Sequence, residues 1–351
     1  MKKLDKLQIN GLTLPELVPL LREMGIETYR AKQIFQWIHQ KGIHNFTQMH
    51  NLPKRVMVEL EDRFTIAAIT VGTKRLSFDK TEKFLFALID NQTIEAVFIP
   101  EGSRNTVCAS SQVGCAMACT FCATGAQGYN RSLSAGEIAA QIEYIERCCQ
   151  TVNASHITNV VFMGMGEPLA NYDELLKAIT ILNHPDGLNI GMRKFTISTC
   201  GIVPKIYQLA QDNDQIGLAV SLHAPTDRKR SAIMPINKTY PIRTLIEACR
   251  HYTEKTRRRI TFEYALIHQF NDTLEDINEL KILLGQLLCH VNVIPVNPVS
   301  DHYMRPTNAQ VAAFVRRLTT NNVPASIRRE RGSDIEAACG QLRQATQEEK
   351  L

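Results

Sequence analysis

The sequence contains no run of 18 or more apolar residues, and its first six residues lack the apolar core of a secretory signal. We therefore expect neither a membrane span nor export, and we predict a cytoplasmic protein that makes no membrane contact. Low-complexity segments and short internal repeats are also missing. With 351 residues, 44% hydrophobic and 21% charged, the composition excludes disordered and fibrous classes and is typical of a packed globular protein.

Structural disulfides are not expected either, although the chain has ten cysteines. Cytosolic thiols are kept reduced, and a chain of this length buries enough core to fold without covalent cross-links. Cysteines that cluster in the sequence therefore need a chemical explanation.

A strong net charge is absent, since the formal charge is only +5, and this supports at most a weak preference for a polyanionic partner. Clusters of Lys and Arg residues can neutralise phosphates, but a solvated helix face explains each such cluster in this chain at least as well. If the partner is RNA, we expect residues 257–259 or 328–331 to contribute to binding. The basic clusters lie at 228–230, 257–259, 316–317 and 328–331.

Two different patterns precede residue 101. Apolar residues at three- and four-residue spacing predict helices over 14–24 and 29–40, and Pro53 opens a third, so residues 1–65 are interpreted as a helical domain with possible RNA contact. Residues 66–100 are interpreted as a β-hairpin extension, with Asp90-Asn91 as a turn. Its alternating segments are 66–73, 83–89 and 94–99.

Residues 101–343 alternate strand-like and helix-like segments, which predicts an α/β fold. Ser134 and Glu137 form a capping box ahead of the first helix. Seven strands fit a partial or complete (β/α) barrel, although a doubly wound sheet fits the same periodicity. The polar tail 344–351 is expected to be frayed. The predicted strands are 106–110, 159–163, 194–199, 217–222, 260–267, 291–296 and 325–329.

The strongest chemical signal is a C-x3-C-x2-C run formed by Cys115, Cys119 and Cys122. A structural zinc site needs four ligands, which Cys108 or a distant histidine would have to complete. Thiolates are also the normal ligands of iron-sulfur clusters, and three of them on a cubane leave one iron open to a substrate or cofactor. The run, with Phe121 before its third cysteine, resembles the signature of the radical S-adenosylmethionine (SAM) superfamily.

That resemblance implies a partial (β/α) barrel whose ligands bind beyond the carboxyl ends of the strands. Residues suited to SAM stand at four such ends. Glycines allow close backbone approach, Glu167 offers a carboxylate to an ammonium group, and hydroxyl and amide groups offer neutral hydrogen bonds. The four segments are 164–167, 198–199, 221–223 and 297–298.

Further motifs narrow the resemblance over residues 14 to 343. The chain is similar to the bacterial dual-specificity adenine carbon-2 methyltransferases, a family acting on 23S ribosomal RNA and transfer RNA. The motifs are C-x2-C-A-T-G from Cys119, M-G-M-G-E-P from Met163, S-L-H-A-P from Ser221, M-P-I-N from Met234 and D-I-x-A-A-C-G-Q-L from Asp334.

The resemblance implies roles for individual residues. Cys115, Cys119 and Cys122 match the ligands of a 4Fe-4S cluster. Cys339 matches the cysteine that carries the methyl group, with two SAM molecules used per turnover, and Cys108 matches the cysteine that releases the RNA adduct by forming a disulfide with Cys339. Glu95 matches a proton acceptor. The SAM-binding positions matched are Gly166, Glu167, Ser198, Ser221, Leu222, His223 and Asn297.

The implied partners are 23S rRNA, tRNA and an electron donor such as flavodoxin or ferredoxin, and we expect a monomer. Three alternatives stay open. The first is the related carbon-8 methyltransferase, although the resemblance at Pro168 favours the carbon-2 family. The second is methylthiolation, which normally needs a second cysteine triad, and the third is a nonenzymatic iron-sulfur sensor of nucleic acid. The remaining cysteines are interpreted as buried core residues. They are Cys148, Cys149, Cys200, Cys249 and Cys289.

Overall fold

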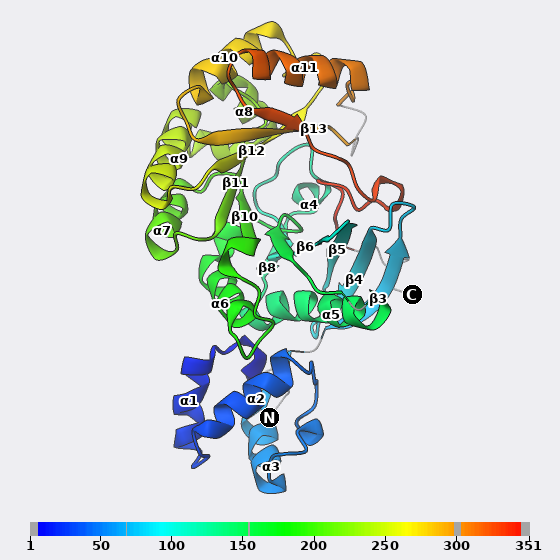
Figure 1. Ribbon diagram of the computed structural model, residues 1–351, viewed down its shortest axis with the longest axis vertical. Helices are drawn as coiled ribbons and strands as arrows, with labels where there is room; N and C mark the ends of the chain where they lie inside the picture. The colour runs from blue at the N-terminus through cyan, green and yellow to red at the C-terminus, as the bar shows by residue number, and fades with distance from the viewer. Residues whose placement is uncertain (1–5, 68, 154, 298–302, 345–351) are drawn as a thin grey trace.

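The computed structural model describes residues 6–67, 69–153, 155–297 and 303–344. Its N-terminal part is a three-helix unit with a hydrophobic cluster of its own (Figure 1). Pro53 precedes the third helix, as the sequence predicts, and the first helix begins with a capping box between Thr13 and Glu16 that the sequence analysis did not anticipate. The elements are β1 (Leu7–Gln8), α1 (Leu14–Glu23), α2 (Tyr29–His39), α3 (Lys54–Arg63) and β2 (Phe64–Thr65), with β1 and β2 paired in parallel.

The β extension continues the main sheet. Strands β3 (Thr70–Leu76), β4 (Glu82–Ala87) and β5 (Thr93–Glu101) are antiparallel, and β5 pairs with β6 of the barrel. The predicted turn is present, with Asn91 at φ 62°. The first strand begins four residues later than predicted, because Ile66 packs into the hydrophobic cluster of the N-terminal helices.

All seven predicted strands of the barrel are present, and each pairs in parallel with the next. The order β6-β9-β10-β11-β12-β13-β14 has no reversal, so the doubly wound alternative is wrong. Among the described residues the sheet does not close, which makes it a partial barrel. The strands are β6 (Arg104–Cys108), β9 (Asn159–Phe162), β10 (Phe195–Thr199), β11 (Gly217–Ser221), β12 (Ile260–Leu266), β13 (Cys289–Pro295) and β14 (Ala325–Ile327).

Helices cover the outer face of the curled sheet (Figure 1). The predicted capping box at the first of them is present, since Ser134 Oγ accepts from the Glu137 N–H at 3.2 Å and the Glu137 carboxylate accepts from the Ser134 N–H at 2.9 Å. The helices are α5 (Ala135–Asn153), α6 (Tyr172–Asn183), α7 (Val203–Asp212), α8 (Asp227–Ile233), α9 (Ile242–Thr256), α10 (Leu274–Leu284) and α11 (Asn308–Thr320).

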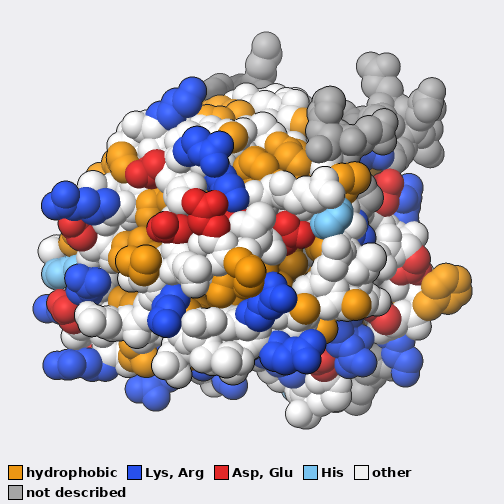
Figure 2. All heavy atoms as spheres, turned by 90° about the horizontal axis from the view of Figure 1, so that it is seen from above, with side chains coloured by type: hydrophobic (Ala, Val, Ile, Leu, Met, Phe, Trp, Pro, Cys, Tyr) orange, Lys and Arg blue, Asp and Glu red, His pale blue; other side chains and the backbone are white. Residues whose placement is uncertain are grey.

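In the part of the chain that the structure describes, no helix is both long and apolar enough to cross a membrane. Lys and Arg side chains are spread over the face seen in Figure 2, with acidic and hydrophobic side chains among them. The predicted basic clusters are not uniformly solvated: Arg230 is fully buried, Lys229 pairs with Asp276 at 2.6 Å, and Arg331 pairs with Glu101 at 2.8 Å. The predicted tail lies outside the described residues from position 345 onward.

Candidate functional site

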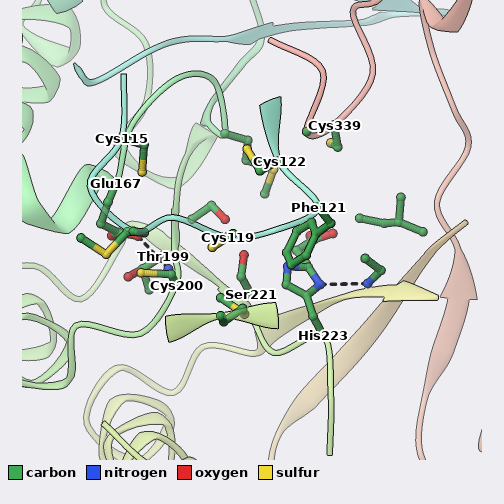
Figure 3. Close-up of a pocket in the computed structure, with 18 of the residues that line it drawn as sticks. Cys115, Cys119, Phe121, Cys122, Glu167, Thr199, Cys200, Ser221, His223 and Cys339 are labelled. Atoms are coloured by element: carbon green, nitrogen blue, oxygen red, sulfur yellow. Dashed lines mark hydrogen bonds between the residues drawn. The ribbon is translucent and has the colours of Figure 1, made fainter. Parts of the chain in front are cut away.

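The three-cysteine run forms a loop over the mouth of the partial barrel. It follows the short strand β7 (Gln112–Gly114) and ends at helix α4 (Ala123–Ala126), which leads to β8 (Tyr129–Ser132). The loop roofs a cavity of about 160 Å³, which we call the cysteine cavity. Figure 3 shows Cys115, Cys119 and Cys122 around this space, with Cys339 approaching from the C-terminal segment. Other lining residues expected from the sequence are Gly166, Glu167, Ser198, Ser221, His223 and Asn297.

The chemistry of these donors fits an iron-sulfur cluster. Burial raises the pKa of Cys115 to about 12 and also raises that of Cys119, and nearby thiols add to both shifts. A bound metal centre supplies the positive charge that makes such thiols lose their protons. Among the described residues, no three His, Cys, Asp or Glu side chains are grouped as ligands of one metal ion. A cluster does not need such a group, because each thiolate binds a different iron.

The two glycines that follow β9 are required by the protein's own packing. A Cβ atom on Gly164 would lie 2.7 Å from the Ala109 carbonyl oxygen. Gly166 has φ +99°, and its Cβ would lie 2.5 Å from the Cβ of Gln112. Both glycines therefore let the end of β9 lie against residues 109–112, a reason that differs from the ligand contact expected from the sequence.

Glu167 lies at this strand end with both carboxylate oxygens engaged by backbone donors. One oxygen accepts from the Cys200 N–H at 2.7 Å and the other from the Leu169 N–H at 3.0 Å. Burial raises the pKa of Glu167, while the Cys200 N–H favours the charged form. The carboxylate is thus held in a fixed orientation at the wall of the cysteine cavity.

His223 is a neutral hydrogen-bond donor toward the cavity. Burial lowers its pKa to about 3, so the ring carries no charge at neutral pH. Its Nδ1 accepts from the Ala265 N–H at 2.8 Å, which places the ring proton on Nε2. The ring of Phe121 packs edge-on against it, with centroids 4.7 Å apart (Figure 3). The neighbouring Leu222 differs from the other predicted SAM positions, because its side chain is fully buried and does not line the cavity.

A second cavity of about 570 Å³ occupies the lumen of the barrel, and we call it the lumen cavity. Cys108 lines it, and Cys339 lines both cavities. Burial raises the pKa of both thiols, to about 12 for Cys108, and Arg328 opposes both shifts. Cys339 also raises the pKa of Cys108, and both thiols line the lumen cavity. All ten cysteines are free thiols in this structure, so the Cys108–Cys339 disulfide is not formed.

The segment that carries Cys339 is tied to the barrel mouth on both sides. Asn297 Nδ2 donates to the Cys339 carbonyl at 3.2 Å, and the Ala123 N–H of α4 donates to the Gly340 carbonyl at 2.7 Å. Asp334, at the start of the same motif, accepts from the Phe78 N–H at 3.2 Å. The D-I-x-A-A-C-G-Q-L motif therefore places its cysteine beside the three-cysteine loop.

Glu95 is not in either cavity. It lies buried on β5, where Lys83 Nζ is 2.9 Å from one carboxylate oxygen and the Arg343 N–H donates to the other at 2.9 Å. Burial raises the pKa of Glu95, and Lys83 opposes that shift. The C-terminal segment thus stands between Glu95 and the lumen.

Two residues at the site, Cys200 and Glu263, were missed in the sequence, and Arg328 was expected only as part of a basic cluster for RNA binding. Cys200 was interpreted as a core residue and is buried, but it also lines the cysteine cavity beside Glu167. Glu263 and Arg328 form an ion pair at 3.1 Å and line both cavities. A carboxylate in the middle of the apolar strand β12 was the signal available for Glu263. Of the other cysteines interpreted as core, Cys149, Cys249 and Cys289 are buried and Cys148 is half-buried.

Comparison with known proteins agrees with this arrangement. The radical SAM superfamily model matches residues 110–280, and the ribosomal RNA large subunit methyltransferase N-terminal domain model matches residues 7–66. The probable dual-specificity RNA methyltransferase RlmN of Geobacillus kaustophilus is 47% identical over 343 residues, covering 97% of this chain and 94% of that protein. The protein of the same name from Staphylococcus aureus is 45% identical over 340 residues, covering 97% and 93%.

A solved structure extends the likeness to the fold. The radical SAM methyltransferase from Sphaerobacter thermophilus superposes with a TM-score of 0.92 at 44% identity, covering 96% of this chain and 99% of that chain. Both matched family models fall on the elements that build the helical unit and the cysteine cavity. The chain therefore belongs to the RlmN family of radical SAM RNA methyltransferases.

Proposed function

We propose that this chain methylates carbon 2 of adenine in 23S rRNA, in the peptidyl-transferase centre, and in tRNA, at the adenine beside the anticodon. The observation that carries the proposal is the position of Cys339, which borders both the cysteine cavity and the lumen cavity. One thiol can therefore receive a methyl group in the first cavity and present it to a base in the second.

In this proposal Cys115, Cys119 and Cys122 hold a 4Fe-4S cluster, and the strand-end residues around them hold SAM. Two SAM molecules are used per turnover. One would supply the methyl group, and the other, together with the cluster, would supply a radical that removes a hydrogen atom from that methyl group. The neutral His223 donates from Nε2, and Ser198, Ser221 and Asn297 add hydroxyl and amide groups. Gly166 and Glu167 fix the strand end between them, and Leu222, whose backbone binds Glu263 and Arg230, fixes the end of β11.

A cysteine carrier suits the chemistry of the target. Carbon 2 of adenine is electron-poor, so direct transfer of an electrophilic methyl group does not occur there, whereas a carbon radical adds. Arg328 favours the thiolate of Cys339 against the effect of burial, and the thiolate is the form that accepts the methyl group. The radical adduct becomes a stable protein–RNA adduct when it returns one electron to the donor system and loses the carbon-2 proton. The Cys108 thiolate then attacks the Cys339 sulfur: the bond between that sulfur and the transferred carbon breaks, the carbon takes up a proton and becomes the methyl group, and the disulfide forms.

Glu95 is the proposed acceptor of the adenine proton. Its carboxylate is held by Lys83 and by the Arg343 N–H, on the far side of the C-terminal segment. We propose that RNA entry displaces Arg343 and frees the Glu95 oxygen that its N–H now occupies, while Cys339 and Gly340 stay tied to the barrel mouth. The protein works as a monomer in the cytoplasm, with flavodoxin or ferredoxin as electron donor.

The test is mass spectrometry of nucleosides after anaerobic incubation of the reconstituted protein with SAM, a reductant and unmodified rRNA or tRNA. We expect 2-methyladenosine from both RNA classes. Formation of 8-methyladenosine would assign the chain to the carbon-8 reaction instead. Cluster-dependent RNA binding without any SAM turnover would favour the nonenzymatic sensor.

A further inference from the structure

Arg230 lies next to the cysteine cavity and is fully buried, with 0% of its surface exposed. Among the described charged residues beside this cavity it is the most deeply buried. It stands on α8, one turn before the M-P-I-N motif. Its guanidinium holds the carbonyls at two neighbouring strand ends: Nη2 donates to Cys200 at 2.6 Å and to Ser221 at 3.0 Å, and Nε donates to Leu222 at 3.2 Å. It thus joins β10 to β11 directly behind the cavity wall.

The last residue of the M-P-I-N motif, Asn237, holds the Arg230 side chain in place. Asn237 Oδ1 accepts from Arg230 Nη1 at 2.9 Å, and Asn237 Nδ2 donates to Asp227 at 2.8 Å and to Ser231 at 2.8 Å. All four acceptors of the Arg230 hydrogen bonds are therefore neutral oxygens. A buried guanidinium normally pairs with a carboxylate, because an uncompensated charge in the interior is costly.

The groups that interact electrostatically with Arg230 lie on both sides of the wall. Asp227, a carboxylate on α8, contributes and is linked to Arg230 through Asn237. Cys200 and Cys119 contribute more, and both line the cysteine cavity. Arginine keeps its proton even where burial lowers its pKa, so the positive charge is permanent. A cluster held by three thiolates is negative overall, and reduction adds one more negative charge.

We propose that Arg230 is a positioning residue with two separable effects on the proposed cofactor site. Its fork-shaped hydrogen bonds fix the strand-end segments 200 and 221–222, and its buried charge favours the form of the cluster that has gained one electron from the external donor. This inference rests on the proposed function, because it requires a cluster on Cys119 and its two partners.

The experiment compares three variants with the reconstituted wild type. R230K keeps the charge and loses the fork, whereas R230Q loses the charge; R228Q, at an exposed position on the same helix, is the matched control. The measurements are iron content, the midpoint potential of the cluster by a spectroscopically monitored titration, SAM affinity, and the melting temperature of the metal-free protein.

We expect the midpoint potential of R230Q to become more negative than that of wild type, while R230K and R228Q keep the wild-type potential. R230K should bind SAM about tenfold more weakly, because one ammonium cannot hold three carbonyls in place. Equal potentials for R230Q and R228Q would overturn the electrostatic effect, and unchanged SAM affinity in R230K would overturn the positioning effect.

The double change Asp227→Asn/Asn237→Asp keeps the inference testable if R230Q does not fold or load iron. It leaves Arg230 in place and keeps a hydrogen bond between positions 227 and 237, but it moves the carboxylate directly against Nη1, so the potential should again become more negative. An unchanged potential in this variant would overturn the electrostatic effect. Absence of iron in reconstituted wild type would instead count against the proposed function, and the two failures are thereby distinguished.

Discussion

The cysteine cavity and the lumen cavity meet at Cys339 but are lined by different chemistry. Thiols, aromatic rings and short polar side chains surround the first, whereas arginines, threonines and asparagines line much of the second. The first therefore suits a cofactor held away from water, and the second suits a polar substrate. The residues common to both are Met163, Glu263, Ile294, Asn297, Arg328 and Cys339.

This comparison separates two kinds of variant. A change on the shared wall should affect both the cofactor chemistry and the transfer to RNA, because its side chain faces both spaces. A change on only one side should leave the chemistry of the other intact. The following predictions test that separation.

The largest effect is expected from Cys339→Ala. Methylated adenine should fall below detection, because no other thiol lines both cavities among the described residues. SAM binding and iron content should stay at wild-type levels, since the three-cysteine loop is unchanged. Nucleoside mass spectrometry and iron analysis check this, with Cys148→Ala, a half-buried cysteine on α5, as control. Methylation that survived in Cys339→Ala would remove this thiol from the reaction.

Cys108→Ala should block only the release step, which takes place in the lumen cavity, and leave the chemistry of the cysteine cavity intact. The methyl group should still reach the adenine, but the adduct should accumulate because the second thiol needed for release is gone. Denaturing gel electrophoresis with labelled RNA would show a slowly migrating protein–RNA species that nuclease removes. Normal release of free product by this variant would contradict the role proposed for Cys108.

Lys83→Met tests the region outside both cavities. Removing one member of a buried ion pair leaves Glu95 uncompensated, and we expect a loss of about 3 kcal/mol in unfolding free energy. Urea denaturation measures it. The second change in Lys83→Met/Glu95→Gln should recover most of the loss.

The matched control for Lys83→Met is Lys74→Met in the neighbouring strand. Lys74 pairs with Glu82 at 2.9 Å, but its side chain is 40% exposed, so a loss of at most about 1 kcal/mol is expected. Equal losses in the two variants would mean that the buried pair with Glu95 is not what stabilises this part of the sheet.

Much of the fold could be predicted because its signals are local. The alternation of strands and helices, the capping box at Ser134 and the cysteine run are all read within short windows. The choice between a partial barrel and a doubly wound sheet could not be made in the same way. It depends on which strands pair, and pairing joins residues far apart in the chain.

The parts of the site that sequence reasoning missed depend on burial and on long-range contacts. Residues 228–230 look like a solvated basic run, yet α8 turns Arg230 into the wall between two strand ends. The matched position of Glu95 gave no sign that the C-terminal segment separates it from the lumen. Likewise, Cys108 and Cys339 line the same cavity only because the strands that lie between them in the sequence fold into the barrel.

The last prediction concerns the pH dependence that the cysteine cavity gives to the stability of the protein. Burial holds the folded pKa of His223 at about 3, against 6.5 for an ordinary histidine. Below pH 6.5 the unfolded chain takes up a proton at His223 that the folded chain does not, so stability falls as the pH falls toward 3. From pH 7 to pH 5 this costs about 2 kcal/mol, and His223→Gln should remove that loss.

Urea denaturation of the metal-free protein at pH 7 and pH 5 measures the difference. Glu95 and Glu167 have raised pKa values and act in the opposite direction, but they are present in both proteins and cancel in the comparison. His50→Gln, at an exposed histidine of the N-terminal unit, is the matched control substitution. If His223→Gln and wild type lose the same stability on acidification, His223 takes up its proton in the folded state. The cysteine cavity would then present a charged imidazolium to its ligand at pH 5, and the Nε2 donor that stays neutral across this range would be wrong.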